Sequence, residues 1–151
     1  WFDYMHENGV YDNTRIILVA DHGRGLYLNW DRVIDNGPDT DFFFPLLMVK
    51  DFNAKGFSFS DTFMTTADVP TLATSGLIDN PTNPFTGNAI NANAKYDRPF
   101  YAFMSYDWDT SKNNGNQFFP GTWYRVDNQN ARDKRNWVMV GENTVLPDGL
   151  R

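Results

Sequence analysis

The chain of 151 residues is long enough for a domain with a buried core, and its 41% apolar and 21% charged residues are ordinary for a globular protein. Its 19 acidic and 13 basic residues give a formal net charge of −6, which argues against a nucleic-acid partner and against docking on an anionic membrane. The absence of cysteine excludes disulfides and thiol chemistry, and no apolar run is long enough to span a bilayer.

The first half of the chain has the element pattern of an α/β protein. The sequence of Trp1–Asn8 is typical of the middle or end of a helix, so we expect the chain to be a piece of a larger protein, and Gly9 is expected to end this helix in the left-handed conformation. Ile16–Ala20 is an unalternating apolar run, typical of a strand covered on both faces in a parallel sheet. After a polar loop over Gly25–Asp41, a second buried strand is predicted over Phe42–Val49.

The second half changes character after one more helix. This helix is predicted to begin at a Thr65 or Thr66 cap and to end near Gly76. Three strand-like segments joined by polar links then predict a small antiparallel sheet. These segments are Pro99–Ser105, Thr122–Val126 and Asn136–Val140. We therefore expect two domains, an α/β part over residues 1–90 and a small antiparallel β subdomain over residues 91–151.

The most informative pair of side chains follows the first predicted strand. Asp21 and His22 supply a carboxylate and an imidazole, which suit a divalent metal such as zinc or manganese. Ligands of open α/β sheets bind beyond the carboxyl ends of strands, and Gly23 lets the strand end here so that both side chains reach one site. An isolated Asp-His-Gly is also typical of a capped strand end with a surface histidine. The surrounding residues are therefore needed to distinguish a metal site from a strand cap.

Those surroundings resemble a known family. The stretch Asn8–Gly23, with the sequence NGVYDNTRIILVADHG, closely resembles a signature of the sulfatase and lipoteichoic-acid-synthase group of the alkaline phosphatase superfamily. Three downstream segments are also similar to this group, namely Phe44–Leu47, Ala67–Leu72 and Asn83–Ile90. The resemblance covers about Trp1–Ile90 and implies the C-terminal portion of an alkaline phosphatase-like α/β/α sandwich, followed by the small appended antiparallel sheet.

The resemblance also implies a chemistry. Members of the group hydrolyse or transfer sulfate or phosphate esters with a nucleophile activated by divalent metal. Asp21 and His22 match the family's metal ligands, with manganese, magnesium, calcium and zinc all open as the ion. The nucleophile and the other acidic ligand belong to the N-terminal part of the same protein, so this chain alone is expected to be inactive. The resemblance further implies an extracytoplasmic location, at the cell surface or secreted, often with a membrane anchor upstream.

Other polar residues are weaker candidates. Related enzymes often have another histidine after Asp-His-Gly, but the loop after Gly23 has none. Arg24 and Asn29 are the remaining candidates for substrate binding, although an arginine beside a loop glycine is also typical of plain surface. His6 is expected to be solvated or packed.

The C-terminal aromatic residues leave a second function open. They are Phe100, Tyr101, Phe103, Tyr106, Trp108, Phe118, Phe119, Trp123 and Tyr124. They predict either the core of a small sheet or a surface that stacks on sugars, and the second interpretation corresponds to a non-catalytic extracellular glycan-binding module on the same fold. The segment Asp107–Gln117 is a guess for calcium, because it lacks the spacing of a defined calcium loop.

Overall fold

The computed structural model describes residues 1–26, 28, 30–105 and 121–142, and the chain divides into two compact units. The first comprises Trp1–His22 and Pro45–Ala92, and the second comprises Gly23–Phe44 and the described part of Asn93–Arg151. The division does not follow one point in the sequence, because residues 23–44 pack with the C-terminal sheet. The chain crosses between the units at His22–Gly23, directly after the candidate metal ligands.

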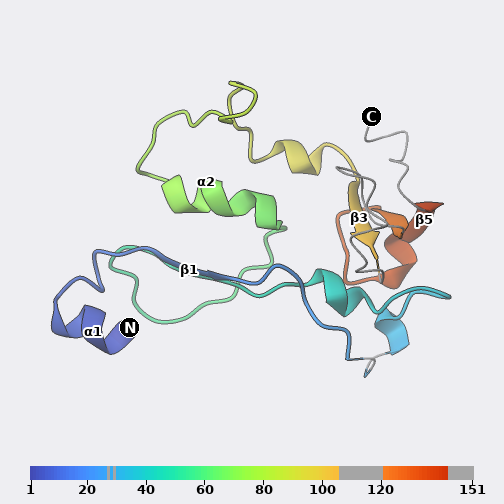
Figure 1. The fold of residues 1–151 in the computed structure, drawn as a ribbon, viewed down its shortest axis with the longest axis horizontal. Coiled ribbons are helices and arrows are strands. Elements are labelled where there is room, and N and C mark those ends of the chain that lie inside the picture. The colour runs from blue at the N-terminus through green and yellow to red at the C-terminus, as the bar shows by residue number, and fades with distance from the viewer. Residues whose placement is uncertain (27, 29, 106–120, 143–151) are drawn as a thin grey trace, which may run out of the picture. The chain divides into compact units, whose positions relative to one another are not determined.

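The first unit is built on a two-stranded antiparallel ribbon (Figure 1). Strand β1 (Ile16–Val19) pairs with β2 (Leu47–Lys50), and Ile16 lies opposite Lys50. Apolar residues on both faces explain why the run does not alternate. Leu18 and Val19 point to opposite faces, yet each is 44% exposed, so each face of β1 remains partly open.

The expectation of a parallel neighbour is wrong for this pair of strands. A parallel connection needs a crossover, usually an α-helix, whereas an antiparallel connection needs only a return of the chain. Between β1 and β2 the described residues form short 3₁₀ helices, η1 (Trp30–Arg32) and η2 (Thr40–Phe43), and no α-helix. The α/β class therefore holds in general terms, with antiparallel pairing in both sheets.

The second strand also begins later than predicted. Residues 42 and 43 belong to η2, which begins because the Asp39 side chain accepts a 2.9 Å hydrogen bond from the Asp41 amide. Pro45 has no amide hydrogen to donate to a ladder, so regular pairing starts only after it.

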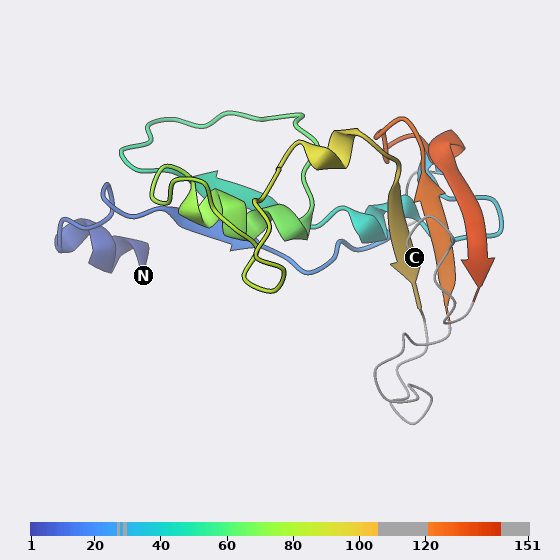
Figure 2. The ribbon, with the colours of Figure 1, turned by 90° about the horizontal axis from the view of Figure 1, so that it is seen from above.

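Two short α-helices flank the ribbon. Helix α1 (Phe2–Glu7) is followed by Gly9 at φ 67°, the predicted left-handed helix end. Helix α2 (Val69–Thr74) follows the 3₁₀ turn η3 (Thr66–Asp68), where the predicted cap at Thr65 forms a capping box with Asp68. Helix α2 lies over one face of the ribbon (Figure 2).

The second unit is a three-stranded antiparallel sheet in the order β3-β4-β5, as the sequence predicts. The strands are β3 (Phe100–Met104), β4 (Thr122–Val126) and β5 (Trp137–Glu142), seen side by side in Figure 2. The remaining 3₁₀ turns of this unit are η4 (Ala94–Tyr96) and η6 (Lys134–Asn136).

The core of this unit lies on β4 and β5. Tyr124, Val126 and Trp137 are buried, and Ile34 and Phe43 pack against them. These contacts explain why residues 23–44 belong to this unit. Of the predicted aromatic residues, Trp123 and Tyr124 are buried, and Phe100, Tyr101 and Phe103 are partly buried. The others, Tyr106, Trp108, Phe118 and Phe119, lie outside the described residues.

Candidate metal site

Asp21 and His22 directly follow the last ladder position of β1. The Ala20 amide donates a 3.0 Å hydrogen bond to the Leu46 carbonyl, which continues the β1–β2 register by one residue beyond the strands. The chain then leaves the ladder at Asp21. The two side chains therefore lie past the last ladder position of the strand.

The two side chains lie close together and face solvent. The His22 amide donates a 3.0 Å hydrogen bond to Asp21 Oδ1, and His22 Nε2 lies 3.8 Å from the same oxygen. The side chains of Asp21 and His22 are 90% and 67% exposed. Ligands of one metal ion lie about 3–3.5 Å apart when each bond is about 2.0–2.2 Å long. A small side-chain rotation is enough to bring these two donors onto one ion.

Gly23 is required by a close backbone approach. Its amide donates a 2.9 Å hydrogen bond to the Phe42 carbonyl. A Cβ atom at this position would lie 2.6 Å from the Phe44 carbonyl oxygen and closer still to that of Asp41. Real Cβ atoms do not come so near to backbone, so the residue after His22 has to be glycine.

Gly23→Ala is accordingly expected to destabilise the protein by about 1–3 kcal/mol, the typical cost of forcing an extra methyl group into a packed site. Chemical denaturation monitored by tryptophan fluorescence measures this change. Gly56→Ala is an informative comparison, because nothing lies within 4 Å of a Cβ there and only its φ of 75° opposes the substitution. If Gly23→Ala cost no more than Gly56→Ala, the close approach at Gly23 would be wrong.

The other candidate residues have different environments. Arg24 is exposed in the second unit, and it makes no hydrogen bond or ion pair with the described part of the chain. Asn29 lies outside the described residues, as does the whole candidate calcium segment Asp107–Gln117. His6 stacks on Tyr11 with ring centroids 3.8 Å apart, which is a packing contact.

The residues before β1 hold the strand in place. Thr14 Oγ1 donates a 2.7 Å hydrogen bond to the Val10 carbonyl and closes the turn that precedes the strand. Lys50, at the end of β2, donates to the carbonyls of Tyr11 and Thr14, and its ammonium lies 4.4 Å from the centre of the Tyr11 ring. Lys50 is not singled out by its sequence, because only its place opposite Ile16 brings it to this turn.

The described residues supply two candidate ligands rather than a complete set. Among residues 1–26, 28, 30–105 and 121–142, no group of three or more His, Cys, Asp or Glu side chains is placed to hold a metal ion. The donor types, one carboxylate and one imidazole, fit a divalent cation. Asp21 and His22 can therefore form part of a coordination sphere.

Comparisons of the chain with family models, with curated proteins and with solved structures gave no match. Within its described part, the chain has no helix long and apolar enough to cross a membrane, in agreement with the short apolar runs of the sequence.

Proposed function

We propose that this chain is the C-terminal part of a metal-dependent sulfatase-like enzyme that hydrolyses or transfers sulfate or phosphate esters. The observation that carries the proposal is the placement of Asp21 and His22 as adjacent, exposed donors directly past the end of β1, with Nε2 and Oδ1 3.8 Å apart. The resemblance of Asn8–Gly23 to the sulfatase and lipoteichoic-acid-synthase signature supports the same conclusion.

In this proposal the chain contributes metal ligands and not the nucleophile. Asp21 and His22 hold a divalent ion, of which manganese, magnesium, calcium and zinc are the candidates. Such an ion, when bound, neutralises negative charge on the ester group. The N-terminal part of the same protein supplies the nucleophile and the remaining ligands. The half-exposed Leu18 and Val19 support a contribution from the N-terminal part. Their apolar side chains lie on both faces of β1, as in a strand that is covered on both faces within a larger sheet.

The substrate and its location follow from the same resemblance. A small-molecule, glycan or lipid ester outside the cytoplasm is the proposed substrate. Arg24 is the described side chain best suited to contact its charged group, because it is cationic, exposed and close in sequence to the two ligands. Trp123 and Tyr124 are buried and do not favour the alternative glycan-binding function, which would depend on the remaining aromatic residues of that set.

Titration of the chain with Mn²⁺ tests the proposal, because the chain has only two histidines. A bound paramagnetic ion broadens the NMR signals of nearby protons. We expect weak binding that broadens the ring signals of His22 and the amides of residues 21–23, since two ligands do not make a closed site. The ring signals of His6, which stacks on Tyr11, serve as the internal control and should stay sharp.

His22→Ala and Asp21→Asn should each remove the broadening at residues 21–23. Equal broadening of His6 and His22 would mean that manganese binds exposed imidazoles without a site. Absence of broadening at His22 at millimolar manganese would contradict the proposed ligand role.

A further inference from the structure

The apolar pattern of β1 and β2 does not by itself fix how the two strands align. Ile16–Val19 carries apolar side chains on both faces, and so does the Leu47–Val49 part of β2. A slip of two residues keeps each side chain on its original face and replaces one apolar pair by another. Some other contact therefore has to select the observed register.

The ion pair between Arg15 and Asp51 is the contact that can select the register. One step beyond the Ile16–Lys50 pair, the register places Arg15 opposite Asp51. Arg15 Nε and Nη2 each lie 2.9 Å from Asp51 Oδ1. A hydrogen bond from the Phe52 amide and the bonds from Arg15 lower the pKa of the Asp51 carboxyl, so the carboxylate form is favoured. A slip of two residues would separate the two charges.

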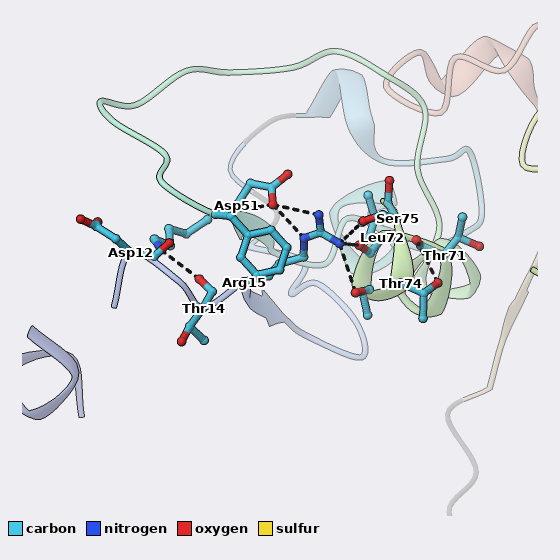
Figure 3. A network of polar contacts seen from close by, with 11 residues as sticks. Asp12, Thr14, Arg15, Asp51, Thr71, Leu72, Thr74 and Ser75 are labelled. Atoms are coloured by element: carbon cyan, nitrogen blue, oxygen red, sulfur yellow. Dashed lines mark hydrogen bonds and ion pairs between the residues drawn. The ribbon is translucent and has the colours of Figure 1, made fainter. Parts of the chain in front are cut away.

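The same guanidinium also ties the strand to α2. Arg15 Nη1 donates to the carbonyls of Leu72, Ala73 and Ser75 at 2.9, 3.1 and 2.7 Å (Figure 3). These carbonyls lie at the C-terminal end of the helix, where backbone acceptors lack helical partners and a cation is favourable. The Arg15 side chain is only 11% exposed, and its planar guanidinium holds its N–H groups in one fixed geometry.

We propose that Arg15 is a positioning residue that selects the β1–β2 register through Asp51 and the end of α2, and so determines where Asp21 and His22 leave the ladder. A slip of two residues would move them along the strand by about 7 Å. The register role of Arg15 does not depend on a metal site. Its consequence for metal binding rests on the proposed function.

Cysteine pairs can report the register directly, because the chain contains no cysteine of its own. The Ala20–Leu46 hydrogen bond makes Ile17 and Val49 a non-hydrogen-bonded pair, the kind with the shorter Cα separation that suits a disulfide. Ile17→Cys with Val49→Cys reports the native register. Ile17→Cys with Leu47→Cys forms a disulfide only when β1 has slipped by two residues.

In the parent background the native-register pair should oxidise at least about tenfold faster than the slipped pair, a preference within reach of hydrogen bonds to a charged group. Arg15→Met should shift this ratio toward one. Arg15→Lys should give an intermediate ratio, since lysine keeps the charge and loses the planar fork. Arg125→Met, which removes a comparable pair with Asp127 in the second unit, should leave the ratio unchanged.

The outcomes separate the two proposals. A general loss of structure would speed the oxidation of both cysteine pairs. Arg125→Met controls for this effect, because it removes a comparable ion pair outside the β1–β2 ribbon. An unchanged ratio in Arg15→Met, with the far-ultraviolet circular dichroism spectrum retained, would overturn the register role even if Mn²⁺ broadens His22. A shifted ratio without broadening of His22 in the parent chain would instead overturn the metal site and leave the register role standing.

Discussion

Under the proposed function, Asp21→Asn and His22→Ala are each expected to abolish turnover by the full-length protein while leaving its fold nearly intact. Both side chains lie past the ladder and are largely exposed, so neither substitution opens a core cavity, and each should cost less than about 1 kcal/mol of stability. Metal-stabilised charge contributes several kcal/mol to the transition state, so turnover should fall by about 10²–10³-fold or more.

The experiment compares turnover of nitrophenyl sulfate and nitrophenyl phosphate, bound metal by elemental analysis, and melting temperature. His6→Ala is the matched control and should retain both metal and turnover. The 151-residue chain on its own should hydrolyse neither ester. Near-normal turnover and metal content in His22→Ala would mean that Asp21 and His22 only cap the strand. Turnover by the isolated 151-residue chain would mean that the nucleophile lies within this chain.

Trp137→Ala should be the most damaging change to stability in the second unit. The Trp137 side chain is 6% exposed and packs against Phe43, with ring centroids 4.9 Å apart, and its indole nitrogen donates a 2.8 Å hydrogen bond to the Ala131 carbonyl. Removing a buried tryptophan costs about 3–5 kcal/mol through lost burial and the cavity left behind.

Met139→Ala on the same strand provides the control, because this side chain is 60% exposed. It should change the free energy of unfolding by no more than about 0.5 kcal/mol. Urea denaturation followed by circular dichroism measures both variants. Similar losses for the two would mean that the core of this unit does not lie at Trp137.

Some of the fold could be predicted from local sequence because local rules determine it. The three C-terminal strands are short apolar segments between polar links, and Thr65 with Asp68 forms a capping box within one turn. Gly9 takes the left-handed conformation because a helix ends just before it. Each of these features depends on residues only a few positions apart.

The orientation of β1 against β2 could not be predicted in this way. An apolar run without alternation indicates cover on both faces, but it carries no information on the direction of its neighbour, and Leu18 is half-exposed rather than buried. The contacts of Arg15 join residues that are 36–60 positions apart, so no local sequence pattern predicts these contacts. The same holds for residues 23–44, whose Ile34 and Phe43 pack on the C-terminal sheet.

In the candidate site, too, some features follow from local sequence and others depend on distant contacts. Asp21 and His22 are recognisable from the residues around them, because the strand, the turn before it and Gly23 form one continuous segment. The reason for Gly23 is visible only in three dimensions, in the carbonyls of Asp41 and Phe44 that leave no room for a side chain. Lys50 and Arg15, which hold the strand, have no chemical signature in the sequence.

The central claim is that Asp21 and His22 bind a divalent metal, and anomalous X-ray scattering tests it most directly. Crystals of the full-length protein grown with manganese should show an anomalous peak about 2.0–2.3 Å from His22 Nε2 and from a carboxylate oxygen of Asp21. Further ligands should come from the N-terminal part of the protein. A fully ordered site in which manganese binds elsewhere, with Asp21 and His22 in contact with solvent alone, would contradict the claim.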